Sequence, residues 1–379
     1  YKVGYWQCDI AQVRRLALTD DVVEFMALQL QKLPESTQTV LKLAACIGNQ
    51  FDLETLAIVY EKSLAETAAD LWKALQEGLL LPQSETYKFF QEESVFSGQS
   101  CVAAIQEQLT VLYKFLHDRV QQAAYFLIPE CKKQSTHLKI GQLLLNNTPE
   151  VEREEKIFEI VNQLNMGVQL ITEQTEQDEL AQLNLIAGRK AKASTAYLAA
   201  VGYLTIGLKL LAADSWGCQY KFTLDLYKDA AEAAYLSGDF EQMERLVEIV
   251  LKQANTLLDR VKIYEIQIQA CIAQNKLLEA VNTALKVLQL LGEEFPEKPS
   301  QLDIGRQLGE TISTLSKQRI EDLIALPEMT DLEKLAAMRI LLRVTAAAFI
   351  ANPVLYPLMV FKLVNLSLTY GNAPSSSIA

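Results

Sequence analysis

The stretch from Phe115 to Tyr125, FLHDRVQQAAY, contains the side chains whose types and spacing could do chemistry. His117 stands where an apolar, strand-like run gives way to a helical one. Asp118 suits the N-cap of that helix, because a short carboxylate accepts from free N–H groups and complements the helix dipole. An imidazole at a helix N-terminus could donate to a phosphate oxygen. From spacing alone, a capping Asp118 and a packed His117 are the simpler interpretation.

The chain lacks the sequence patterns of a complete active site. Neither GxxxxGK[ST] nor GxGxxG occurs, so no phosphate-binding loop is expected, and GxSxG is also missing. With two histidines and no matching nucleophile, a catalytic triad is not predicted. The six cysteines include no CxxC pair and mostly stand in apolar helical runs, which predicts reduced, buried thiols rather than a zinc site. We therefore expect no catalytic residue and no bound metal in this chain.

Composition indicates a globular protein with an acidic surface. Half of the 379 residues are hydrophobic, and the formal net charge of −12 disfavours nucleic acid as a partner. The uncharged run from Val344 to Phe361 is long enough to cross a bilayer, but Asn352-Pro353 and Pro357 interrupt it. With Asn352 as N-cap and proline next, this run predicts two successive helices and no membrane span. The first residues do not read as a signal peptide. Because the cysteines are predicted to be reduced thiols, a cytoplasmic location is expected.

The region 33–129 has the pattern of a small subdomain. Three helices are predicted over Glu35–Cys46, Leu53–Tyr60 and Leu64–Gln76, and Gly78 suits a left-handed helix end. Two short strands follow, one in GLLLPQ and one in VLYKFLHD, before a fourth helix near Asp118. This order of elements predicts a winged helix. A preceding helix, DDVVEFMALQLQKL, would be capped by Thr19 or Asp20.

A winged helix raises the question of DNA binding. The recognition helix would be LAETAADLWKALQE, which has Glu66, Asp70 and Glu77 against a single Lys73. Major-groove readers aim arginine, lysine, asparagine or glutamine at bases and phosphates. The charge of this helix is therefore wrong for DNA, and Trp72 is predicted to lie in the core or in a contact between domains.

Similar helical segments recur in the region 130–292. Three of them begin at Arg189, Asp229 and Ile266, and aligning Tyr197, Phe240 and Leu277 gives a spacing near 40 residues. Each segment reads as a helix, a tight turn and an amphipathic helix, which is a tetratricopeptide-like pattern. Further, truncated repeats are expected over 293–379, after a proline-containing loop. The predicted fold is mostly α, with a winged-helix subdomain followed by a tetratricopeptide-like α-solenoid.

In position and context, Leu116-His117-Asp118 resembles the "MHD" motif that closes the winged helix of the STAND class of signalling NTPases. Gly78-Leu79-Leu80 matches the "GLL"-type run upstream of it, and leucine replaces the methionine. In that class the histidine contacts the β-phosphate of bound ADP and holds the off state. The resemblance thus implies that His117 senses the nucleotide and that Asp118 fixes its loop.

A wider resemblance covers essentially the whole chain. The run from Thr19 to Ala57, including LAACIGNQFDL, resembles the region after the ATPase core of large hybrid kinases of the cyanobacterial type. Those proteins join a Ser/Thr kinase, a STAND-like AAA ATPase, helical repeats, a GAF domain and a histidine kinase. Residues 1–32 would then be the helical end of an upstream ATPase module. The P-loop, the Mg²⁺-binding aspartate and both kinase domains would lie outside this segment.

The resemblance implies a non-catalytic regulatory and protein-interaction segment of an ATP-dependent signal-transduction kinase. ATP or ADP and Mg²⁺ would bind to the parent protein and not to this segment. Its partners would be other domains of the same chain and a protein bound by the repeats. The alternative is the same segment of a STAND-type transcription regulator, which a downstream helix-turn-helix would favour. A freestanding repeat adaptor is a third reading.

Overall fold

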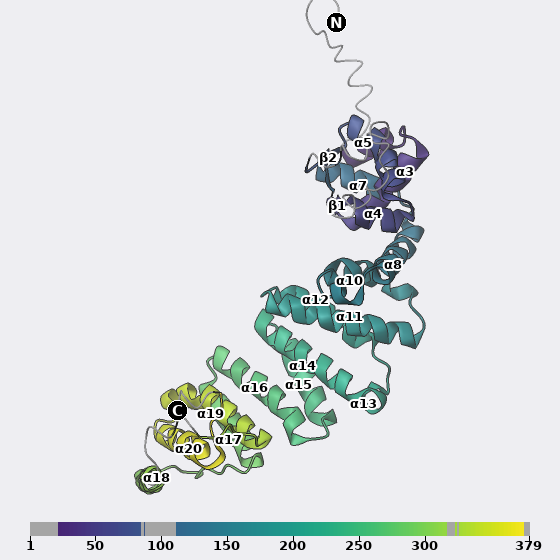
Figure 1. Ribbon diagram of the computed structural model, residues 1–379. Helices are drawn as coiled ribbons and strands as arrows, with labels where there is room; N and C mark the ends of the chain where they lie inside the picture. Colours follow the sequence, from purple (N-terminus) through teal and green to yellow (C-terminus); the bar gives the residue numbers. More distant parts are fainter. Residues whose placement is uncertain (1–21, 85–86, 88–110, 317–322, 324–325, 375–379) are drawn as a thin grey trace, which may run out of the picture. The chain divides into compact units, whose positions relative to one another are not determined.

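The computed structural model describes residues 22–84, 87, 111–316, 323 and 326–374 (Figure 1). Within these residues the chain is mostly helical, with one small sheet. Contacts between Cα atoms divide it into two compact units, residues 1–180 and 181–379. That division falls inside one helix and does not test the predicted boundaries after residues 32, 129 and 292, which stay predictions.

The first unit contains a small subdomain of three helices and three strands. The strands form an antiparallel sheet in the order β1-β3-β2, with Gln50 opposite Lys114 and Leu80 opposite Phe115. The elements follow one another as α3 (Glu35–Ile47), β1 (Gln50–Asp52), α4 (Leu53–Tyr60), α5 (Leu64–Gln76), β2 (Leu80–Pro82) and β3 (Leu112–Phe115). The three helices, β2 and β3 follow one another in the predicted order, whereas β1 was not predicted; the winged helix stays a prediction.

Local side-chain contacts explain why the helices α4 and α5 begin where they do. The Asp52 carboxylate accepts from the backbone N–H of Thr55 at 2.7 Å, and Ser63 and Glu66 form a reciprocal capping box. Both helices have the predicted bounds. Beneath them, Phe51 packs against Tyr113 and Phe115, with ring centroids 5.9 and 5.7 Å apart. This aromatic cluster anchors β3 and so fixes where the residues after it emerge.

A short helix, α7 (Asp118–Phe126), follows β3 and packs on α3 and on α2 (Val22–Leu30). Helix α8 (Glu130–Asn147) then pairs with α10 (Ile157–Met166). A Cβ on Gly141 would lie 2.7 Å from Leu164, so the absence of a side chain lets these two helices approach closely. The remaining short elements of this unit are α9 (Glu150–Arg153) and η2 (Val168–Leu170).

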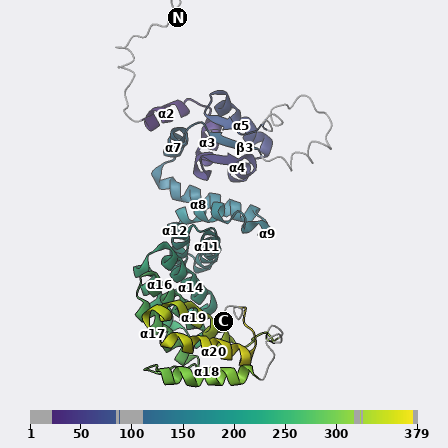
Figure 2. The same ribbon diagram turned by 90° about the vertical axis from the view of Figure 1, so that its left-hand side faces the viewer.

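The second unit consists of helical hairpins, which confirms the predicted tetratricopeptide-like repeats (Figures 1 and 2). The residues aligned from the sequence, Tyr197, Phe240 and Leu277, each begin the second helix of a hairpin. The hairpins pair α11 (Gln174–Ala193) with α12 (Tyr197–Leu210), α14 (Tyr220–Ser237) with α15 (Phe240–Gln253), and α16 (Leu257–Ala273) with α17 (Leu277–Leu290), and the short α13 (Ser215–Cys218) precedes α14.

The three hairpin turns have the same backbone geometry. Two residues before the second helix, Thr195, Gly238 and Asn275 have φ values of 60°, 84° and 59°, in the left-handed region. In each turn, the next N–H donates to the carbonyl five residues earlier, at 2.8 to 2.9 Å, which closes the first helix. The repeat is therefore defined by its turn, although three different residue types occupy the left-handed position.

Thr195 is the least suitable of these three residues, because a β-branched side chain is strained at positive φ. We expect Thr195→Gly to raise the free energy of unfolding by roughly 0.5–1 kcal/mol, after the added entropy of the unfolded chain is subtracted. Urea unfolding of the two proteins would measure the change. Ser194→Gly in the same turn is the control and should lower stability, since glycine relieves no strain there. Equal effects of both substitutions would contradict the argument.

The last hairpin joins α19 (Leu332–Ala351) to α20 (Leu355–Tyr370), and α18 (Gln301–Leu315) packs beside α20 (Figure 2). The break in the uncharged run lies where it was predicted. However, Asn352 is the C-cap of α19 and not the N-cap of α20, because its N–H still bonds to the carbonyl of Ala348. None of the described helices combines the length and apolar character that crossing a bilayer requires.

Three further predictions can be compared with the structure. Cys46 is buried as expected, but Cys131 and Cys218 are exposed. Trp72 is 40% exposed, so it is not part of the core. The proposed caps Thr19 and Asp20, together with Cys8 and Cys101, lie outside the described residues.

Candidate regulatory site around His117

His117 is the N-cap of α7. Its backbone is extended, with φ −150° and ψ 148°, and its Nδ1 accepts a hydrogen bond from the backbone N–H of Arg119 at 3.1 Å. The prediction that Asp118 caps this helix is therefore wrong: Asp118 is already the first helical residue. Imidazole is not among the preferred N-cap side chains, so residue type alone predicted Asp118 as the N-cap.

Asp118 instead ties the start of α7 to the sheet. Its Oδ1 accepts from the Asn49 side-chain amide at 2.9 Å, and the carbonyl of Asn49 accepts from the N–H of Phe115. Asn49 lies between α3 and β1, so the turn before α7 is held from two directions. The carboxylate also stands in the first turn of α7, where its charge complements the helix dipole.

The hydrogen bond to Nδ1 determines what His117 can offer to a ligand. Because Nδ1 accepts, the neutral ring carries its proton on Nε2. The side chain is exposed, as are those of Leu116 and Asp118. An exposed Nε2–H at a helix N-terminus is suited to donate to an anionic oxygen. The geometry thus gives His117 a donor without requiring it to be charged.

A second group of residues, missed from the sequence, connects α7 to the next helices. The Tyr125 hydroxyl lies 3.0 Å from His137 Nε2 on α8, and His137 Nδ1 lies 2.7 Å from Gln163 Oε1 on α10. The Gln163 amide nitrogen donates to the carbonyl of Cys46 at the end of α3, at 2.8 Å. We refer to Tyr125, His137, Gln163 and the Cys46 carbonyl as the relay.

The directions of the hydrogen bonds in the relay follow from its last member. Since Gln163 donates through its nitrogen, its oxygen accepts from His137 Nδ1–H, and His137 Nε2 then accepts from the Tyr125 hydroxyl. His137 and Gln163 are both buried, so these polar atoms depend on one another. Burial also raises the pKa of the Cys46 thiol to about 12, which keeps it protonated and unreactive.

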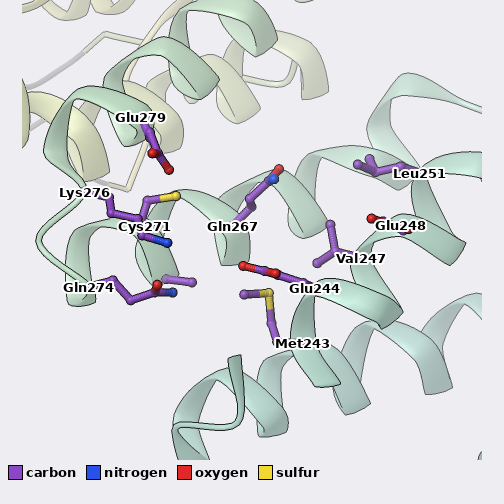
Figure 3. A pocket seen from close by; sticks show the side chains of 11 residues that line it. Met243, Glu244, Val247, Glu248, Leu251, Gln267, Cys271, Gln274, Lys276 and Glu279 are labelled. Atoms are coloured by element: carbon purple, nitrogen blue, oxygen red, sulfur yellow. The ribbon is translucent and has the colours of Figure 1, made fainter. Parts of the chain in front are cut away.

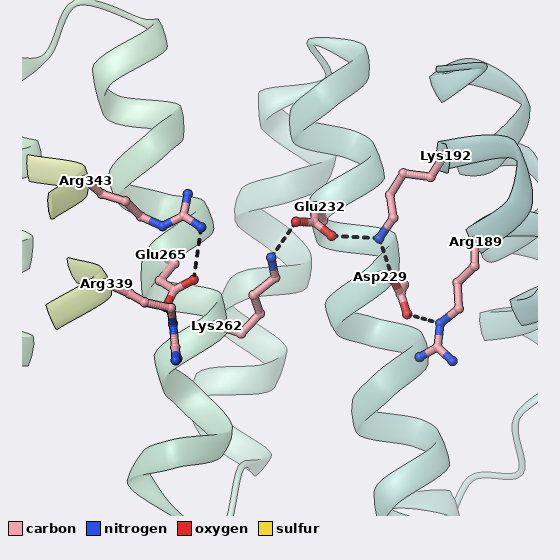
Figure 4. Close-up of polar contacts among 8 residues, drawn as sticks. All are labelled: Arg189, Lys192, Asp229, Glu232, Lys262, Glu265, Arg339 and Arg343. Carbon is pink, nitrogen blue, oxygen red and sulfur yellow. Dashed lines mark hydrogen bonds and ion pairs between the residues drawn. The ribbon is translucent and has the colours of Figure 1, made fainter. Parts of the chain in front are cut away.

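The second unit has its own polar network, which crosses the first helices of successive hairpins (Figure 4). Asp229 on α14 pairs with Arg189 on α11 at 2.7 Å, and Glu232 pairs with Lys192 at 2.6 Å. Lys192 also reaches Asp229, and Lys262 on α16 reaches Glu232. We call this series of ion pairs the ladder.

Glu265 forms the last step of the ladder. Its side chain is only 4% exposed, and Arg339 and Arg343 on α19 approach its two oxygens at 2.9 and 3.5 Å (Figure 4). A buried carboxylate with two guanidinium partners is compensated, whereas the same carboxylate alone would be costly. The charged residues of α11, α14, α16 and α19 therefore join four helices along one line.

The ladder predicts how stability depends on pH. Burial acts to raise the pKa of Glu232, but hydrogen bonds from Lys192 and Lys262 outweigh it and hold this pKa below its ordinary value of 4.5. A depressed pKa in the folded state contributes stability above the unfolded pKa, and the contribution is lost as pH falls through the folded value. We expect urea unfolding to show a flat profile above about pH 5 and a decline below 4.5.

The matched comparison for this pH profile is Glu232→Gln against Glu241→Gln. Glu241 pairs with Arg245 on the exposed surface of α15. Glu232→Gln should have a lower free energy of unfolding at neutral pH. Its free energy of unfolding should also decline less steeply in acid, because one carboxylate fewer takes up a proton on unfolding. A decline unchanged in Glu232→Gln would assign the acid sensitivity to other carboxylates.

No family model matches the chain. The chain is 31% identical over 307 residues to hybrid signal transduction histidine kinase G of Dictyostelium discoideum, and the match covers 70% of this chain and 9% of that protein. A search of solved structures found a Signal Transduction ATPase with Numerous Domains (STAND) protein with a tetratricopeptide repeat sensor, from Pyrococcus horikoshii. That alignment covers 94% of this chain and 56% of the other, at 11% identity and a TM-score of 0.28, which is too low to establish a shared fold.

Proposed function

We propose that the chain is a non-catalytic regulatory and interaction segment of a large ATP-dependent signal-transduction kinase. In this proposal it couples the nucleotide state of an upstream STAND ATPase to the helical repeats. The observation that carries the proposal is the position of His117, an exposed donor at the N-terminus of α7. The similarity of 70% of the chain to a hybrid signal transduction histidine kinase supports the wider role.

Helix α7 provides a physical route from His117 to the next helices. It is nine residues long and is held at its start by the Asn49–Asp118 hydrogen bond. Gln121 donates to the carbonyl of Ala45 at 3.1 Å, and Tyr125 enters the relay near the other end. A displacement of His117 would therefore move α7 as a rigid body and strain its contacts with α3 and α8, and through His137 the link to α10.

For this route to act as a switch, the two nucleotide states must differ in their contacts with it. We propose that ADP engages His117 Nε2–H through its terminal phosphate and stabilises one position of α7. ATP would place an additional phosphate in the same region and favour another position. The hairpins would transmit the difference to a protein partner or to another domain of the same chain.

The test is ADP affinity of a longer parent protein that includes the ATPase domain. We expect His117→Ala to weaken ADP binding about tenfold, equivalent to about 1.4 kcal/mol. Gln122→Ala, an exposed substitution on the same helix, is the control and should leave the affinity unchanged.

His117→Asp separates the two roles of the residue. Aspartate caps a helix well, so α7 should stay folded, but its charge should repel the phosphate and weaken ADP more than alanine does. Unchanged ADP affinity in folded His117→Ala and His117→Asp proteins would leave His117 as a helix cap only.

A further inference from the structure

A cavity of about 300 Å³ lies between α15 and the end of the α16–α17 hairpin (Figure 3). Its floor is apolar, since Met243, Val247 and Ala270 are buried there. Gln267 and Gln274 offer side-chain amides, and Cys271 is partly exposed at the same place. The volume suits one long side chain rather than a cofactor.

The charged residues of this cavity are mostly acidic. Glu244, Glu248 and Glu279 line it together with a single Lys276. Glu248 is 3.9 Å from Lys252, whereas in the part of the chain that the structure describes, Glu244 and Glu279 have no ion-pair partner. Figure 3 shows Glu244 near the middle of the cavity, between Met243 and Gln267.

Glu279 on α17 and Glu244 on α15 line the cavity together with the Cys271 thiol. Burial raises the pKa of the Cys271 thiol, Glu279 and Glu244 raise it further, and the positive charge of Lys276 acts to lower it. A cation placed there would gain from both charges, and its apolar part would cover the floor.

We propose that this cavity binds an arginine side chain of a partner protein, presented on a peptide segment with apolar flanking residues. The arginine stem would lie on Met243 and Val247. The planar guanidinium would donate to the carboxylates of Glu244 and Glu279 and to a glutamine oxygen, since its fork of donors serves several acceptors at once. Lysine, a point charge with fewer donors in a fixed plane, fits less well.

The cavity is independent of the proposed nucleotide sensing. It specifies the chemistry of a partner for the second unit, and none of its residues belongs to the site around His117. An arginine-binding cavity could therefore exist whether or not His117 senses a nucleotide.

Cys271 provides a built-in reporter for the test. The 379-residue chain would be treated with a maleimide, and the labelling rate of each cysteine followed by mass spectrometry of its peptides. The probe is a capped peptide with one arginine between two leucines, and its control has citrulline, the neutral isostere, in place of arginine. We expect the arginine peptide to slow labelling of Cys271 but not of the exposed Cys131 and Cys218.

Two variants then identify the groups responsible. Glu244→Gln combined with Glu279→Gln should weaken the arginine peptide at least tenfold, as measured by the concentration that protects Cys271. Glu241→Gln removes an exposed carboxylate from the same helix, outside the cavity, and should change nothing.

Three results would overturn the proposal. Protection of Cys271 by the citrulline peptide equal to that by the arginine peptide would make the site apolar only. Protection of all three cysteines would indicate general association. Self-association of the chain that depends on Glu244 and Glu279, seen by sedimentation, would identify a second copy as the occupant.

Discussion

Glu265→Ala is expected to lower the free energy of unfolding of the second unit by about 2–3 kcal/mol. Removing one partner of a buried ion pair costs about 3–5 kcal/mol, because the opposite charge stays uncompensated. The expected loss is smaller here, since the Arg339 and Arg343 side chains are 51% and 32% exposed and can regain water. A small cavity left at this buried position adds to the cost.

Hydrogen exchange would show where this loss occurs. Because the chain contains two compact units, urea unfolding alone does not locate the effect, but amides of α16 and α19 should lose protection selectively. Glu241→Ala is the control, since its partner Arg245 is exposed and surface pairs contribute little. An unfolding midpoint unchanged by Glu265→Ala would mean that packing of apolar residues alone holds α16 on α19.

Gln163→Leu should lower the free energy of unfolding of the first unit by about 2–3 kcal/mol. Leucine nearly preserves the volume, but it leaves His137 Nδ1–H and the carbonyl of Cys46 without their partner in a buried place. An unsatisfied buried polar group costs about 1–3 kcal/mol, and two are created. Urea unfolding measures the total, and hydrogen exchange should show the loss in α8 and α10.

Gln134→Leu is the matched control for the relay. Gln134 lies on the exposed face of α8, and its amide meets Gln169 at 3.3 Å. Because water can replace that hydrogen bond, the change should stay within about 0.5 kcal/mol. Equal effects of the two glutamine substitutions would remove the energetic basis of the relay and with it the proposed route through α7.

Elements with strong local signals could be predicted from the sequence. Helices α4 and α5 have the predicted bounds because Asp52 and Ser63 cap them, and capping depends on residues within one turn. The hairpin register was found by aligning Tyr197, Phe240 and Leu277, because in each segment a tight turn separates a helical run from an amphipathic helix. Strand β1 was missed because three residues between two helices carry no alternating pattern.

The candidate site was only partly predictable. The position of His117 at the strand-to-helix junction is correct, but its capping bond depends on a backbone conformation that residue type does not show. The relay joins Tyr125, His137 and Gln163 through tertiary contacts, which periodicity does not reveal. For the ladder a signal existed: charged pairs three residues apart recur at the same place in successive repeats, as in Asp229 and Glu232.

The ladder also implies that resistance to bending is graded along the second unit. The Asp229 carboxylate at the α11–α14 step is 14% exposed and the Glu265 carboxylate at the α16–α19 step is 4% exposed, while Arg189 and Arg339 are similarly exposed, at 49% and 51%. Dissolved ions screen exposed charges within about 8 Å at physiological ionic strength and affect buried ones far less. Raising salt should therefore weaken the joint between α11 and α14 somewhat more than the joint between α16 and α19, which hydrogen exchange at two ionic strengths would show. The stack of hairpins would then be easier to bend at the α11–α14 joint, to a degree that depends on the salt concentration.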